Sequence, residues 1–187
     1  HVLEGFVNIP VSDRAAVRLV GWQKHDAGYV DNILGTRTYP TSGITDDNAD
    51  LAEDNYNTAD TMGLRGALRF DINENWTITP QLIAQKQKAY GSAGVDPNVG
   101  NPVMGYNGTS GELAVKHFFP ESSDDSWHQA ALTVEGKVGN FDLTYVFSQM
   151  KRDVDSESDY SDYGFWYDTL AGYGAYFYDD NGNYINP

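Results

Sequence analysis

Apolar and polar residues alternate with a period of two in several stretches of the chain, which is the pattern of a half-buried β-strand. The clearest example runs from Met62 to Ile72, where every second residue is apolar or glycine and the intervening residues include Arg65, Arg69 and Asp71. Strands of this kind are predicted at about residues 3–11, 15–24, 60–72, 76–87, 126–138 (with a shorter stretch at 113–119) and 141–152.

The connections between these strands are of two kinds that alternate along the chain. Tight turns are predicted at residues 12–13, 73–75 and 139–140, where Ser, Asp, Asn and Gly favour hairpins. Long loops are predicted at the remaining connections, at about residues 25–59, 88–125 and 153–187. In a meander this alternation places all tight turns at one end of the sheet and all long loops at the other, as in outer-membrane barrels. The predicted fold is therefore an all-β, antiparallel up-and-down meander forming part of a large transmembrane β-barrel, with short periplasmic turns and long extracellular loops.

Composition and charge exclude or disfavour several classes of protein. The chain has no run of about 18 apolar residues, which excludes a membrane-spanning helix. A mean hydropathy of -0.52 is compatible with alternating barrel strands. The net charge of -15, from 12 basic and 27 acidic residues, argues against nucleic acid as a partner. Most of this negative charge falls in two predicted loops, at residues 26–58 and 153–187.

Several segments resemble the barrel of TonB-dependent receptors. In order along the chain they read VNIP (7–10), RLVGW (18–22), HDAGYVDN (25–32), NWTITPQ (75–81), HFFP (117–120) and QAALTVEG (129–136). The resemblance covers most of the chain to about residue 170. It implies a plugged barrel of the 22-stranded type in the bacterial outer membrane, in contact with lipid and lipopolysaccharide.

The resemblance also implies a partner and a larger parent protein. Uptake would be energised by a TonB-ExbB-ExbD type complex acting through a plug domain. The chain would supply about six of the strands, with the plug domain and the closing strands absent. Because it begins at His1 without an initiator Met and ends at Pro187 without a closing element, we expect a fragment.

The acidic segment after residue 153 is rich in aromatic residues and is the predicted ligand-binding region. Aromatic rings beside carboxylates suit sugars, which offer C–H faces for stacking and hydroxyls for hydrogen bonding. The residues predicted to bind a small-molecule or oligosaccharide ligand are Tyr160, Tyr163, Trp166, Tyr167 and, from another loop, His117. Acid-rich loops disfavour an anionic ferric siderophore. The alternative is a loop that packs on itself without touching a ligand.

Three arginines lie on the polar side of the predicted strands. Arg18, Arg65 and Arg69 are expected to line the barrel lumen, where they would pair with plug-domain carboxylates or with Asp71 and Glu135 of the wall.

No catalytic residue, metal site or cofactor is predicted. The four histidines lack a ligand spacing such as HExxH, and the acidic run at 179–183 lacks the later glutamate of a calcium loop. The predicted function is thus a non-enzymatic uptake receptor for a scarce nutrient. Two alternatives stay open: a soluble or surface-exposed β-rich carbohydrate-binding module, and a structural assembly protein that pairs through exposed strand edges.

Overall fold

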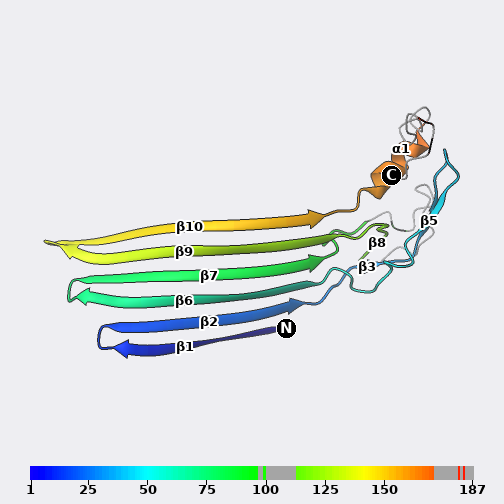
Figure 1. Cartoon of the computed structure of the whole chain (residues 1–187). Helices are drawn as coiled ribbons and strands as arrows, with labels where there is room; N and C mark the ends of the chain where they lie inside the picture. The colour runs from blue at the N-terminus through cyan, green and yellow to red at the C-terminus, as the bar shows by residue number, and fades with distance from the viewer. Residues whose placement is uncertain (97–98, 100–112, 171–180, 182, 184–187) are drawn as a thin grey trace. The chain divides into compact units, whose positions relative to one another are not determined.

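Six long strands form one antiparallel sheet in the computed structural model of the chain, which describes residues 1–96, 99, 113–170, 181 and 183. The strand order is β1-β2-β6-β7-β9-β10, a meander without crossovers (Figure 1). The strands are β1 (Val2–Ser12), β2 (Ala15–Asp26), β6 (Ala59–Asn73), β7 (Trp76–Tyr90), β9 (Ser122–Val138) and β10 (Phe141–Glu157). The all-β antiparallel meander expected from the alternation is confirmed, and the sheet is open rather than closed.

The tight turns follow from local chemistry. Between β9 and β10 the chain reverses at Gly139, whose φ of 63° lies in the left-handed region that glycine adopts without a steric cost. Irregular pairing marks the other two hairpins, between Pro10 and Ser12 and between Asp71 and Asn73. Because alternation fades at strand ends, the observed strands extend beyond the predicted ones; β9, for example, begins at Ser122.

The chain divides into two compact units. The sheet unit comprises residues 1–26, 59–89 and 123–155, and the loop unit comprises residues 27–58, 90–122 and 156–187. The three segments predicted as long loops therefore form a unit of their own. Its elements are β3 (Asp31–Asn32), β4 (Thr36–Thr38), β5 (Thr45–Asp47), β8 (Ala114–Val115) and α1 (Ser161–Thr169).

Two predictions for the loop unit need correction. The stretch at 113–119 forms only the two-residue strand β8, which pairs in parallel with β3. Its residues Ala114 to Lys116 are buried, so they contribute to the interior of the loop unit and not to the large sheet. In addition, residues predicted as irregular loop after 153 continue β10 and then form the helix α1.

One face of the sheet unit is apolar. Residues paired directly across antiparallel strands share a face, and Leu64 pairs with both Gly21 and Ala84. On β1, β2, β6 and β7 the apolar side chains of this face are Leu3, Val7, Ile9, Val17, Leu19, Met62, Leu64, Leu68, Phe70, Ile72, Ile78, Pro80, Leu82 and Ala84.

Side-chain contacts extend the two faces to β9 and β10. The Trp76 ring lies against Gly136, so the even-numbered residues of β9, including Val134, share the apolar face. On the opposite face Arg152 of β10 contacts Asp125 of β9 at 2.7 Å. The odd-numbered residues of β10 therefore add to the apolar face, namely Phe141, Leu143, Tyr145 and Phe147.

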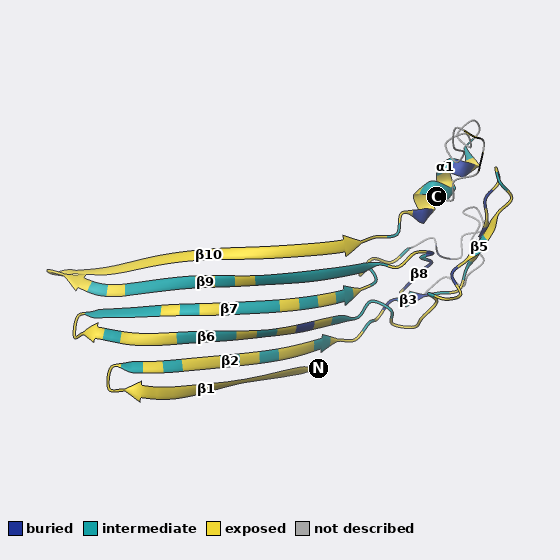
Figure 2. Cartoon of the chain, in the orientation of Figure 1, coloured by how far each residue is buried: buried dark blue, intermediate teal, exposed yellow. Residues whose placement is uncertain are grey.

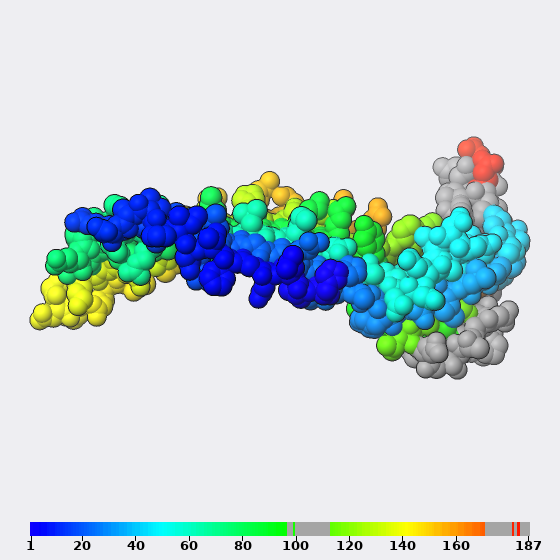
Figure 3. Space-filling model, turned by 90° about the horizontal axis from the view of Figure 1, so that it is seen from below, coloured from blue at the N-terminus to red at the C-terminus, as the bar shows by residue number. Residues whose placement is uncertain are grey.

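The sheet unit has no apolar core. Among the residues that the structure describes, every buried apolar side chain belongs to the loop unit: Val30, Tyr39, Val99, Ala114, Val115 and Phe118. Strands β1 and β10 are exposed at every residue (Figure 2). The space-filling view shows β1, in dark blue, uncovered along its length (Figure 3). Because β1 pairs only with β2 and β10 only with β9, these two strands are the edges of the sheet.

The apolar residues of this face form a band along the strands. From Met62 to Ile72 there are ten residue steps, which at about 3.3 Å each span roughly 33 Å along the strand. At the Met62 end the same face becomes polar: Gln23 and Lys86 pair directly with Met62, and His25, Asp60 and Lys88 form the next level. No helix in the described part of the chain has the length and hydropathy needed to span a membrane.

Candidate ligand-binding sites

The helix α1 presents a cluster of aromatic side chains. The rings of Tyr163 and Trp166 stack with centroids 5.9 Å apart, and Tyr167 stands edge-on to both at 4.7 and 4.9 Å. The hydroxyls of Tyr163 and Tyr167 share a hydrogen bond of 2.8 Å. Tyr163 and Trp166 are 56% and 44% exposed, so the cluster offers ring surface to solvent. We call Tyr163, Trp166 and Tyr167 the aromatic cluster.

The opposite side of α1 is held by a buried cation. The Arg37 side chain is 1% exposed; its guanidinium lies 3.8 Å from the Phe118 ring centroid and donates to Asp162 of α1 at 3.1 Å. The rings of Tyr39 and Phe165 also flank it, at 5.3 and 5.7 Å. This contact of a guanidinium with several aromatic faces fixes which side of the helix faces outward.

His117 lies in a different place. It lines a polar pocket of about 300 Å³ within the loop unit, and none of the α1 residues lines it. Its Nδ1 is 2.8 Å from a carboxylate oxygen of Glu121 and 3.1 Å from the Tyr56 hydroxyl. The structure therefore groups three of the five predicted ligand residues in the aromatic cluster. Tyr160 precedes the helix, where it is 74% exposed, and His117 belongs to the polar pocket.

Buried asparagines hold the segments around this pocket together. The Asn48 amide donates to the carbonyl oxygens of Ile33 (3.0 Å) and His117 (3.1 Å), and its oxygen accepts from the Gly35 N–H at 2.7 Å. Asn32 donates to the His117 carbonyl at 3.1 Å and accepts from the His117 N–H at 2.8 Å. Sequence reasoning missed these residues, because a structural asparagine in a loop looks the same as a turn asparagine.

Two titratable groups near His117 are shifted. Burial raises the pKa of Tyr56 to about 12, and the nearby Glu121 carboxylate adds to the effect, although the Ser92 N–H bound to its oxygen opposes it. Burial alone would raise the pKa of Asp159, but hydrogen bonds from Ser161, Phe118 and Phe119 outweigh it and hold this pKa below its usual value. Tyr56 thus stays a neutral phenol while Asp159 stays a carboxylate.

The three arginines predicted to face a lumen share the polar face of the sheet unit. Arg18 pairs across strands with Ala67, whose neighbours on that face are Arg65 and Arg69. Arg65 donates two hydrogen bonds to Gln81, at 3.1 and 2.7 Å. Arg69 contacts Asp71 at 3.3 Å, and the Arg18 guanidinium lies 4.4 Å from the centroid of a phenylalanine ring on β1. All three side chains therefore have partners within the sheet, as for residues that order a wall.

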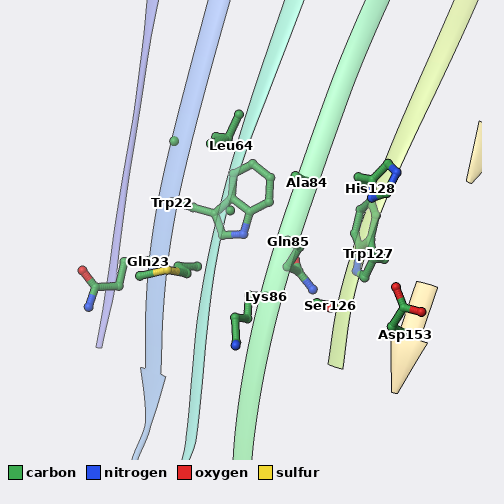
Figure 4. Close-up of a pocket in the computed structure, with 13 residues that line it drawn as sticks. Trp22, Gln23, Leu64, Ala84, Gln85, Lys86, Ser126, Trp127, His128 and Asp153 are labelled. Carbon is green, nitrogen blue, oxygen red and sulfur yellow. The ribbon is translucent and has the colours of Figure 1, made fainter. Parts of the chain in front are cut away.

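A second pocket, of about 580 Å³, lies in the sheet unit. Trp22 on β2 pairs directly with Gly63 on β6, and a Cβ at Gly63 would overlap the Trp22 ring. The indole consequently crosses β6, and Gln85 and Trp127 lie farther along the same pocket (Figure 4). The tryptophan–glycine pair shows why glycine is needed inside a strand at this position.

The two units differ in net charge. The sheet unit has 12 acidic and 10 basic residues, a net charge of -2, whereas the loop unit has 15 acidic and 2 basic residues, a net charge of -13. Those two basic residues, Arg37 and Lys116, are 3% and 2% exposed. Burial also lowers the pKa of Lys116. The outer surface of the loop unit is therefore acidic and favours neutral or cationic ligands over anions.

The fold defines the class as an all-β protein with an open antiparallel meander and a separate, acidic loop unit. Comparisons with protein-family models, with curated proteins and with solved structures gave no match. The resemblance to TonB-dependent receptors stays a prediction.

Proposed function

We propose that the chain forms part of the wall and the outer loops of a bacterial outer-membrane barrel that takes up a neutral or cationic nutrient. The observation that carries this proposal is the apolar band of the sheet unit, which is exposed to solvent across all six strands. A single-layer sheet cannot hide an apolar face by itself, so another material must cover it. We propose that this material is lipid.

Dimensions support lipid over a second protein layer. A strand of 15 residues such as β6 is roughly 50 Å long at about 3.3 Å per residue, while strands of soluble proteins usually have about 5–6 residues. The apolar band of about 33 Å, tilted by about 40–45°, would be roughly 25 Å tall, which is the usual height of the lipid-facing band of a barrel. The exposed edges β1 and β10 would then pair with further strands of the barrel.

The loop unit supports a binding role. It has an acidic surface and an exposed aromatic cluster, a combination suited to an oligosaccharide. In this proposal the ligand binds outside, and passage inward is driven by a TonB-type partner, as the resemblance implies. The arginines of the polar face would order the wall around the lumen.

The absence of cysteine makes a direct test possible, because a single cysteine can be introduced and labelled. Leu68 and Ala67 are neighbours on β6 and point to opposite faces. An environment-sensitive fluorophore at Leu68→Cys should be quenched by spin-labelled lipid in the membrane fraction of Gram-negative cells producing the protein. The same label at Ala67→Cys should be quenched by an aqueous quencher instead.

The outcomes separate the alternatives. A protein recovered in the aqueous fraction, with Leu68→Cys shielded from both quenchers, would indicate a soluble sandwich and contradict the proposal. Equal lipid quenching at both positions would contradict the assignment of one face to lipid.

The ligand part is tested separately. Removing the Trp166 ring should lower the affinity for a bound oligosaccharide roughly tenfold, or about 1.4 kcal/mol. Trp76, which packs against Gly136 in the sheet, serves as the control. Screening Trp166→Ala and Trp76→Ala on the same glycan array would reveal a ligand that depends on the cluster, and equal losses would exclude a specific role for it.

A further inference from the structure

The polar pocket around His117 is a built site with an inward carboxylate. The Glu121 side chain is only 11% exposed and lines the pocket, whereas the His117 side chain is 20% exposed. Glu121 also accepts a hydrogen bond from the Asp159 N–H at 3.2 Å, and its other oxygen contacts the Tyr56 hydroxyl at 3.2 Å. These contacts fix the carboxylate at one position before any ligand arrives.

The walls of the pocket are aromatic and its remaining charged groups are acidic. Tyr56, Tyr90 and Phe119 supply ring surfaces, and Asp50 and Glu53 supply two exposed carboxyl side chains. No Lys or Arg lines this pocket in the part of the chain that the structure describes. Aromatic faces and carboxylates together are the environment that stabilises a cation in a partly desolvated site.

The position of the Tyr56 wall is set by the backbone. A Cβ at Gly91 would overlap the Tyr56 ring, and Gly91 has a φ of 65°, which favours glycine. The Tyr56 oxygen accepts a hydrogen bond from the Ser92 N–H at 2.9 Å. Tyr56 is therefore held from two directions and keeps the pocket open beside Glu121.

From this arrangement we infer that the pocket binds an amino sugar through its protonated amine. The ammonium group would sit between Glu121 and the aromatic walls, and Asp50, Thr58 and Glu53 would meet the ring hydroxyls. A volume of about 300 Å³ lies at the lower end of the range for small-ligand pockets, about 300–1,000 Å³, and suits a single ring. The inference rests on the proposed function for its ligand class, but it names a site apart from the aromatic cluster.

The test compares two ligands that differ at one group. The purified full chain is titrated with D-glucosamine and, separately, with D-glucose, and the heat of binding is measured. The two sugars have the same ring and differ in one group, an ammonium in glucosamine and a hydroxyl in glucose. Glucosamine should bind at least tenfold more tightly than glucose. Equal affinities, or no binding of glucosamine, would overturn the inference.

Substitutions locate the binding. Glu121→Gln should reduce glucosamine affinity at least tenfold and leave glucose affinity unchanged, whereas Asp54→Asn, at an exposed acid outside the pocket, should change neither. Because Glu121 also holds Asp159, Glu53→Gln provides a second variant at an exposed position, with an expected two- to threefold loss. An unchanged glucosamine affinity in both pocket variants would place the binding elsewhere.

Failure here can be told apart from failure of the proposed function. Lipid quenching at residue 68 without glucosamine binding would contradict only the amino-sugar site. Glucosamine binding by a protein recovered in the aqueous fraction would contradict only the proposed location in the membrane.

Discussion

The sheet unit and the loop unit solve the problem of burial in opposite ways. The sheet unit satisfies its backbone through long ladders of hydrogen bonds but leaves its apolar face uncovered. The loop unit has only short strands and one helix, yet it contains every buried apolar side chain among the described residues. The difference teaches that backbone pairing alone does not complete a fold. The sheet unit needs material from outside the chain, whereas the loop unit is organised from within.

The largest expected effect comes from placing a charge in the apolar band. Leu132→Arg on β9 should destabilise a membrane-inserted sheet by about 2–4 kcal/mol, because an arginine would meet lipid near the middle of the band. Its neighbour Thr133 faces the other way, beside Glu135, so Thr133→Arg should cost less than about 1 kcal/mol. Unfolding by denaturant in lipid vesicles measures both, and similar losses would mean that the two faces do not differ.

A smaller effect is expected inside the loop unit. Asn48→Ala leaves the Gly35 N–H and the carbonyl oxygens of Ile33 and His117 without their buried partner, at a cost of about 2–3 kcal/mol. Amide hydrogen exchange in the loop unit should accelerate accordingly while exchange in the sheet unit stays the same. Asp54→Ala, an exposed position, is the control. Acceleration in both units would show that they unfold together.

The anchoring of α1 can be tested at Arg37. Arg37→Ala, which removes the side chain beyond Cβ, should weaken the attachment of the helix to the loop unit by about 1–2 kcal/mol, since the contacts with Phe118 and Asp162 are lost. Arg37→Met should cost less, because the methionine keeps apolar volume beside the Phe118 ring and Asp162, whose side chain is 49% exposed, stays hydrated when the guanidinium is removed. The fluorescence of Trp166 reports the release, and no change in Arg37→Ala would disprove the anchoring role.

The smallest effect is a dependence on pH through Asp159. Its pKa is lower in the folded protein, so its contribution is complete above the ordinary value of about 3.9 and is lost as the pH falls through the lowered pKa. The protection of the Phe118, Phe119 and Ser161 amides, which donate to Asp159, should fall at acid pH when each exchange rate is compared with the intrinsic rate at the same pH. In Asp159→Asn this difference between pH 6 and acid pH should shrink, and an undiminished difference would assign it to other carboxylates.

The sequence identified the long strands because alternation is a local property of the chain. Met62 to Ile72 could be assigned to two faces without knowing any neighbour, and turn chemistry at Gly139 marked a hairpin. The stretch at 113–119 was misjudged, since a short apolar run looks alike in a strand and in a buried loop. The aromatic cluster was found through composition, whereas Asn48 and Glu121 were not, because their partners lie far away in the sequence.

The sequence by itself determined the strand pattern, the two faces of the sheet and the concentration of acid in the loops. These follow from residue order, which local backbone geometry converts directly into structure. Only the tertiary structure decided that the loops form a unit with a core, that both of its cations are buried, and that His117 joins Glu121 and Tyr56 in a pocket. Those features depend on contacts between distant segments, and such contacts leave no periodic signal in the chain.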